Sequence, residues 1–354
     1  MFSAWLAVTG LAVAPPPPAP FSLQDVEESS LLIHGARVIV RPGVELADAD
    51  VLIQRGVVVA VGEGLAAPEG AREITGAVVC AGFLDPWAVL GLDGGSATDQ
   101  SVTAASRTVD ALDHWSEADH LGDALEAGVT ASRVQAGVRS LMSGIGAVVR
   151  NDPSLLADGA VVLEDACVGA SIGLVRGGRA RDIFDRVGEV SRLVGQIESG
   201  RKYRESQVEY KYELEEWQKA IEEKEKELEK DFKKAKKDRK KDKEKAEEKG
   251  KEFKEKKYKE DKKPRKPKYD ADSEAMARVA DGEVPLVVET HRYEELRRLL
   301  KKTDGFDRLR LFVAGGTESL HHAEELKASG VAVIVWPNPM GPGRGDEYDG
   351  HELS

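Results

Sequence analysis

A stretch near the middle of the chain carries too much charge to form a buried core. Residues 201–270 contain 28 Lys/Arg and 21 Asp/Glu, and such side chains are almost never fully buried unless they are paired. The stretch therefore divides the 354-residue chain into folded parts on either side of it. The rest of the chain is acidic, with 23 Lys/Arg against 42 Asp/Glu. Nucleic acid is therefore not an expected partner, because an acidic surface repels phosphates.

An apolar stripe with helical spacing leads into this charged stretch. Its members recur every three or four residues, at Ile183, Val187, Val190, Val194 and Ile197, and again at Tyr210, Leu214, Trp217, Ile221 and Leu228. The spacing predicts one long helix, and the charge of 233–268 predicts solvated helix or disorder. Two interpretations stay open. The helix packs on its own domain and runs out into water, or 183–232 is an arm for self-association or for a partner protein.

The first thirty residues are similar to an export signal followed by a spacer. An apolar run ends in Ala12-Val13-Ala14 and is followed by Pro15-Pro16-Pro17-Pro18. The run is too short to span a bilayer in the usual way, so we predict a periplasmic or secreted protein without a transmembrane span. A cytoplasmic location is the alternative, because no Lys or Arg precedes the run. Cys80 and Cys167 lie far apart and outside any C-x-x-C pattern, which predicts buried small residues without a disulfide.

The remaining chain alternates between short β-rich runs and helix-like runs. Four β-rich runs joined by turns between residues 31 and 82 predict a small antiparallel β-sandwich. After residue 82, strands alternate with helices, which predicts an α/β fold with a parallel sheet, either a barrel or a doubly wound sheet. The predicted strands are 84–92, 128–134, 160–163, 285–288, 309–313 and 331–335, and the predicted helices are 111–127, 293–302 and 319–329.

Several phrases of the sequence resemble the amidohydrolase superfamily, and its imidazolonepropionase-like branch most. They are Gly35-Ala36-Arg37-Val38, the run 50–62, Gly82-Phe83-Leu84-Asp85, the run 124–130, and Gly315-Gly316-Thr317-Glu318. The resemblance implies a β-sandwich followed by a TIM-type (β/α) barrel, here incomplete and carrying a long charged helical insertion. It implies the following parts: 1–30 a signal-like, proline-rich segment; 31–82 the sandwich; 83–200 the first part of the barrel; 201–270 the insert; and 271–354 further barrel units.

The same resemblance implies a divalent metal, zinc, bound by side chains at the strand ends, and hydrolysis of a carbon–nitrogen bond in a small amide or cyclic amide. The family has an H-x-H pair just after the Asp of Gly-Phe-Leu-Asp, but this chain has Trp87 and Val89 there. Neither side chain can bind such a metal, so we expect metal binding to be absent or weak. Glu289 and His291 are the remaining candidate ligands or acid–base groups, with Asp85 in support.

Two function hypotheses follow. The first is an amidohydrolase-like protein of the C–N hydrolase class. If the missing metal ligands have abolished its activity, it is a pseudoenzyme. The alternative is a non-catalytic binding or scaffold protein that uses the barrel as a platform and the charged helix as an interaction arm. Gly169-Ala170-Ser171-Ile172-Gly173 also matches the G-x-S-x-G turn of serine hydrolases, for which a flexible turn is the alternative. His321 and His322 are adjacent on a predicted helix, so they cannot face one metal together, and both are expected to be exposed.

Overall fold

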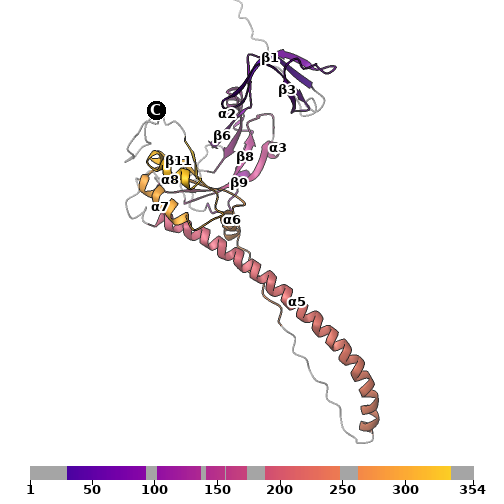
Figure 1. The fold of residues 1–354 in the computed structure, drawn as a ribbon. Helices are drawn as coiled ribbons and strands as arrows, with labels where there is room; N and C mark the ends of the chain where they lie inside the picture. The colour runs from indigo at the N-terminus through magenta and orange to yellow at the C-terminus, as the bar shows by residue number, and fades with distance from the viewer. Residues whose placement is uncertain are drawn as a thin grey trace, which may run out of the picture. The chain divides into compact units, whose positions relative to one another are not determined.

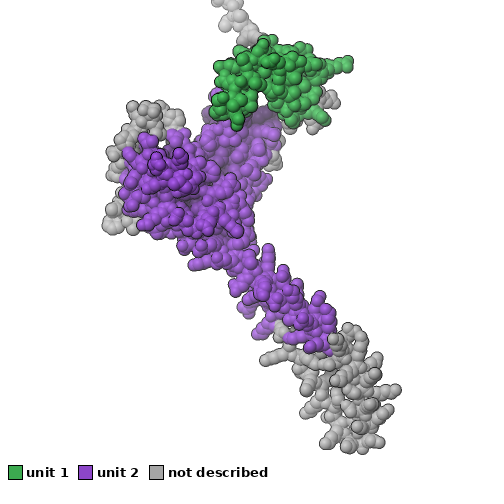
Figure 2. All heavy atoms as spheres, in the orientation of Figure 1, with its two compact units in different colours: residues 1–83 green, residues 84–354 purple. Residues whose placement is uncertain are grey.

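The computed structural model describes residues 30–92, 102–136, 141–155, 157–173, 188–247 and 262–335, without the side chains of 157–158 and 228–247 (Figure 1). The predicted export segment, apart from Ser30, and residues 336–354 lie outside the described residues. The chain divides into two compact units, residues 1–83 and 84–354 (Figure 2).

The first unit holds one five-stranded sheet. Its strands are β1 (Ser30–Arg41), β2 (Val44–Gln54), β3 (Val57–Gly62), β4 (Arg72–Thr75) and β5 (Val78–Cys80). The antiparallel arrangement predicted from the sequence is confirmed for β1, β2 and β3, but β4 and β5 pair with β1 in parallel. A small core lies on one part of this sheet and comprises Ile33, Ala36, Val38, Ala49 and Val51.

The second unit is built on a seven-stranded, barrel-like sheet. Its strands are β6 (Phe83–Ala88), β7 (Val129–Val134), β8 (Met142–Arg150), β9 (Val161–Ser171), β10 (Leu286–Thr290), β11 (Leu311–Gly315) and β12 (Ala332–Ile334). They follow the order β12-β11-β10-β9-β8-β7-β6. Strands β9 to β12 are parallel, as predicted.

Strand β8 departs from the predicted parallel arrangement, because it pairs antiparallel with both β7 and β9. Only residues 135–141 separate β7 from β8, and a parallel crossover needs about a dozen residues or more. The fold is therefore mixed α/β, and the sheet is not a uniform repeat of parallel strands.

The helices follow the sequence pattern closely in the last third of the chain. They are η1 (Thr108–Ala111), α2 (Ala118–Glu126), α3 (Ala157–Ala160), α5 (Glu189–Glu247), α6 (Ala271–Ala280), α7 (Tyr293–Thr303), η2 (Ser319–His322) and α8 (Ala323–Ala328). The single helix predicted over 111–127 is wrong in its first half. The carboxylate of Asp113 accepts hydrogen bonds from the amides of Trp115 and Ser116, at 3.1 and 3.0 Å, and this local turn competes with the helix.

Helices α5, α6 and α7 cover one face of the parallel strands. Alternate strand residues such as Val168, Ala170, Leu286 and Val288 belong to the same buried cluster as the first apolar residues of α5. The helix members of this cluster are Val190, Leu193, Val194, Ile197, Ala275, Met276, Val279 and Leu299. The first half of the apolar stripe is thus a core-facing stripe, because it buries side chains against the sheet.

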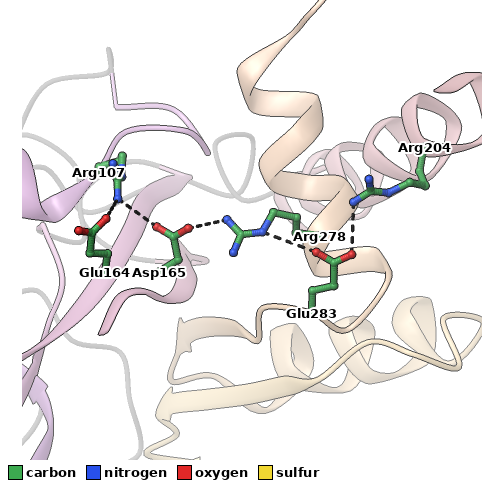
Figure 3. A network of polar contacts seen from close by, with 6 residues as sticks. All are labelled: Arg107, Glu164, Asp165, Arg204, Arg278 and Glu283. Atoms are coloured by element: carbon green, nitrogen blue, oxygen red, sulfur yellow. Dashed lines mark hydrogen bonds and ion pairs between the residues drawn. The ribbon is translucent and has the colours of Figure 1, made fainter. Parts of the chain in front are cut away.

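A chain of ion pairs ties the start of α5 to α6 and to strand β9 (Figure 3). Arg278 of α6 lies 2.7 Å from Asp165 and 3.7 Å from Glu283, and Arg204 of α5 lies 3.5 Å from Glu283. Arg107 extends the network at its other end, where it pairs with Asp165 and Glu164 of β9. Arg204, Arg278 and Asp165 are half-buried, whereas Arg107, Glu164 and Glu283 are exposed. The charges alternate in sign along a network, and charges in a network contribute more to stability than an isolated surface pair does.

Beyond Arg204, α5 runs away from the sheet (Figure 1). It is one helix of 59 residues, so the helical part of the prediction for the charged stretch is confirmed up to Glu247. Tyr210, Leu214, Trp217 and Ile221 are only half-buried. The ammonium group of Lys263 lies 5.9 Å from the Trp217 ring centroid, so the returning chain runs beside the helix there. Among the described helices, none is long and apolar enough to cross a membrane.

The crossing of α5 and α6 should be the most substitution-sensitive point of the arm. A Cβ on Gly200 would lie 2.3 Å from the backbone carbon of Met276, whereas a Cβ on Gly195 meets nothing within 4 Å. We expect Gly200→Ala to lower the free energy of unfolding by about 1–3 kcal/mol through overpacking. Gly195→Ala, in the same helix, should raise it by up to about 1 kcal/mol through helix propensity. Urea unfolding of both variants checks this, and equal effects would contradict the tight crossing.

Candidate active site

The second face of the seven-stranded sheet carries polar side chains among apolar ones. Residues that pair directly across strands share a face, and Val287 pairs with Gly169 while Glu289 pairs with Ser171 and Ala314. Since side chains alternate along a strand, these residues face away from the helix-covered core. Trp87, Cys167, Val287, Phe312, Ala314 and Ile334 form an apolar cluster on this face. We call it the inner face.

A buried guanidinium lies on the inner face, supplied by Arg133 at the end of β7. Its Nε donates to the carbonyl of Pro86 at 2.6 Å, and its Nη1 donates to Gln135 Oε1 at 2.9 Å and to Cys167 Sγ at 3.0 Å. Its Cζ lies 4.7 Å from the centroid of the Trp87 ring, a distance suited to a cation–π contact. No carboxylate of the described residues forms an ion pair with this cation, and its Nη2 has no hydrogen-bond partner there.

Gln135 is held in one orientation by the glycines around it. Its Nε2 donates to the carbonyls of Ser143 and Gly144, at 2.7 and 3.0 Å, which leaves Oε1 to accept from Arg133 and from the Cys167 thiol. A Cβ on Gly169 would lie 2.6 Å from Gln135 Cδ. The glycine on β9 therefore makes room for this amide.

Glu289 and His291, two of the three site residues predicted from the sequence, lie next to each other at the end of β10. The Nε2 of His291 lies 3.5 Å from Glu289 Oε1, and its Nδ1 lies 2.7 Å from Thr317 Oγ1. Burial raises the pKa of Glu289 above its ordinary value, and the His291 hydrogen bond and the charges of His291 and Arg133 oppose that shift. The second oxygen of Glu289 has no hydrogen-bond partner among the described residues.

Asp85 is not part of that pair. Its carboxylate accepts a hydrogen bond from the Trp87 amide at 2.8 Å, and no hydrogen bond or ion pair within the described chain joins it to Glu289 or His291. Trp87 stands under the Arg133 guanidinium, whereas Val89 is exposed. The two positions where the resemblance expects metal ligands thus hold a cation-binding ring and a surface side chain.

These residues do not fit the zinc site that the family resemblance implies. Within the described ranges, no group of three or more His, Cys, Asp or Glu side chains is placed to hold a metal ion. Glu289 and His291 could offer two donors, and a catalytic zinc site needs three protein ligands. The guanidinium of Arg133 also acts on the charge of Glu289, and a fixed cation disfavours a second cation nearby.

Two further sequence motifs have a structural role. Ser171 of the G-x-S-x-G match is the last residue of strand β9 and is buried, with its Oγ 3.5 Å from Ser143 Oγ. The exposed nucleophile is therefore wrong, and the turn predicted over 169–173 is wrong for residues 169–171, which belong to the strand. His322 is buried rather than exposed, because its ring stacks on Tyr293 at 4.1 Å and its Nδ1 lies 2.7 Å from Glu325 Oε2. His321 is exposed, as expected.

The fold has a counterpart among solved structures. An amidohydrolase from Thermotoga maritima MSB8 superposes with a TM-score of 0.61 at 21% sequence identity, over 87% of this chain and 70% of that one. The chain therefore has an amidohydrolase-like fold. A prolidase complexed with N-methylphosphonate-L-proline matches 86% of this chain and 66% of its own, at 14% identity and a TM-score of 0.39, too low to carry an argument. No protein-family model and no curated protein matches the sequence.

Three residues of the inner face could not be predicted from the family resemblance. Arg133, Gln135 and Cys167 were not singled out as site residues, because the resemblance directs attention to histidines and carboxylates. A signal was present nonetheless: Arg133 and Gln135 are polar residues two apart at the end of a strand whose other residues predict burial.

The buried carboxyl of Glu289 predicts a pH-dependent effect on stability. A raised pKa in the folded state means that ionised Glu289 destabilises the fold. That penalty is absent below the ordinary pKa of 4.5 and grows as pH rises through the folded-state pKa. We expect Glu289→Gln to raise the free energy of unfolding at neutral pH and to have a shrinking effect toward pH 4. Urea unfolding across this range checks it, with the exposed Glu324→Gln as control. A difference that grows toward pH 4 would refute the role of burial.

Proposed function

We propose that this chain is an amidohydrolase-like protein that has exchanged metal-dependent hydrolysis for a binding or scaffold role. In this role the barrel-like sheet is the platform and α5 is the interaction arm. The observation that carries the proposal is the Arg133 guanidinium stacked on Trp87. Trp87 stands where the family resemblance places a metal ligand, and its ring instead contacts the positively charged side chain of Arg133.

Electrostatics supports this assignment. A guanidinium keeps its charge at any physiological pH, and here Pro86, Gln135 and Cys167 fix its position. Binding a dication beside Glu289 would require the metal to approach this fixed charge with at most two protein ligands. Metal affinity depends on the number and geometry of ligands, so the arrangement favours a site without a tightly bound metal.

The long helix supports the other half of the proposal. The first turns of α5 are fastened to the sheet by apolar packing and by ion pairs. Most side chains of its residues 205–227 are exposed, and many of them are charged. A helix rises by about 1.5 Å per residue, so it can extend a contact surface well beyond the sheet.

Hydrolysis without the family's metal site is the second candidate function. One observation favours it: burial raises the pKa of the Glu289 carboxyl above its ordinary value, which is the direction of shift that a general acid needs. In that case Glu289 would act as the acid or base, with His291 positioned by Thr317 beside it, on a small amide or cyclic amide. The residues of the inner face would orient this substrate.

The metal content of the purified protein distinguishes a binding role or metal-free hydrolysis from metal-dependent hydrolysis. We expect the dialysed full-length protein to hold less than roughly 0.1 zinc, manganese or iron per chain, because two ligands do not retain a metal through dialysis. Elemental mass spectrometry measures it, with Glu289→Ala and His291→Ala as controls. A near-stoichiometric metal that is lost in both variants would overturn the proposal. Turnover of amides that is lost in Glu289→Gln, without any metal, would favour the second candidate.

A further inference from the structure

Strand β4 is held at the edge of the five-stranded sheet by few contacts. It pairs only with β1 among the described strands, and all four of its residues, Arg72–Thr75, are exposed. None of them belongs to the buried cluster of this unit. A strand that buries no side chain depends on its backbone hydrogen bonds and on any side-chain contact that joins it to the sheet. Segments with so few buried contacts are the first to open.

One such side-chain contact joins β4 to β1 and β2 through a histidine. His34 of β1 lies between two carboxylates, with its Nδ1 3.3 Å from Asp50 Oδ1 of β2 and its Nε2 2.9 Å from Glu73 Oε2 of β4. An ionised carboxylate only accepts hydrogen bonds. A neutral imidazole has one N–H to donate, whereas the imidazolium has two. Both contacts are therefore hydrogen bonds only when His34 carries a positive charge.

The two carboxylates differ in how firmly they are held. Asp50 is buried, and it also accepts hydrogen bonds from the amides of Gly35 and Leu65, at 3.0 and 2.9 Å. Glu73 is exposed, and His34 is its one side-chain partner among the residues that the structure describes. When His34 loses a proton, the fixed Asp50 keeps the remaining N–H, and Glu73 turns into water. The contact that is lost is the one to β4.

We propose that His34 is a pH-dependent link that holds β4 on the sheet when its ring is charged and releases β4 when its ring is neutral. The release opens the edge of β1 that β4 covers, from Leu31 to His34. The rest of the sheet stays in place, because β1, β2 and β3 pair with one another independently of β4.

The titratable groups on the neighbouring strands favour the charged form of the ring. β2 supplies Asp50 and also Asp48, which lies beside the residue that follows His34. β4 supplies Glu73. β3 has no titratable residue, and Cys80 of β5 pairs farther along β1. Acidic groups therefore face this imidazole from both sides, and opposite charges nearby favour the charged form.

The direction of the pH dependence follows from this arrangement. The hydrogen bond with Glu73 raises the pKa of His34 most, partial burial opposes it, and the hydrogen bond with Asp50 and the charges of both carboxylates add to the rise. A pKa that is higher in the folded than in the unfolded protein stabilises the fold below the ordinary value of 6.5. That stabilisation is lost as the pH rises through the pKa of the folded protein, so β4 is released on the alkaline side.

Titration of the imidazole tests the link. Glu73→Gln removes one carboxylate and should lower the pKa of His34 toward 6.5. Glu69→Gln, an exposed glutamate before β4, is the matched control and should leave it unchanged. Nitrogen-15 NMR of the histidine rings of the full-length protein measures the pKa, with His34→Gln to assign the signal. A wild-type pKa at or below 6.5, or equal shifts in Glu73→Gln and Glu69→Gln, overturns the proposal.

Amide hydrogen exchange tests the release of the strand. Between about pH 6 and about pH 9, the protection factors of residues 72–76, corrected for intrinsic exchange, should fall roughly two- to fivefold, because one exposed ion pair is lost. Protection of the β2–β3 ladder should not change. In His34→Gln the protection of β4 should be independent of pH, since glutamine does not titrate, and circular dichroism verifies folding. The same fall in His34→Gln, or no fall in the wild type, would refute the role of His34.

Discussion

The packing of α5 against α6 on the outer face of the parallel strands is the constraint on which the second unit depends. The charged stretch interrupts the sheet between β9 and β10, two strands that pair directly. The chain can leave and return only if both ends of the excursion are held at the sheet. The core cluster shared by α5, α6 and α7 does this, and Gly200 allows the two helices to approach at backbone distance. The ion pairs of Arg204 and Arg278 then fix the same crossing from its polar side.

Patterns that depend on local spacing could be predicted from the sequence. The strands at 285–288 and 309–313 and the helix at 293–302 follow from apolar periodicity, because each has one face that must be buried. The direction of β8 could not be predicted in this way, since it depends on the short connection from β7 and on the pairing that this connection permits. The turn at Asp113 could not be predicted from periodicity either. Its carboxylate accepts hydrogen bonds from the backbone amides of Trp115 and Ser116, and this local turn competes with a continuous helix.

The candidate site could be predicted only in part. Glu289 and His291 were identified by resemblance and do lie together. Arg133, Gln135 and Cys167 come from two strands that are not sequence neighbours, and only the arrangement of the sheet brings them into contact. Their hydrogen bonds form a closed set in which Gln135 accepts from both of the others. A buried charge is tolerated when its surroundings supply such partners, which explains how the Arg133 guanidinium persists on the inner face without an ion pair to any carboxylate that the structure describes.

Charge also limits what can assemble with this protein. The chain outside residues 201–270 has 42 acidic and 23 basic residues, so two copies repel each other at long range. Association of copies therefore requires a surface from which charge is excluded or on which it is matched locally. Screening at physiological salt reduces repulsion between charges more than about 8 Å apart, but it leaves contacts at shorter range in force.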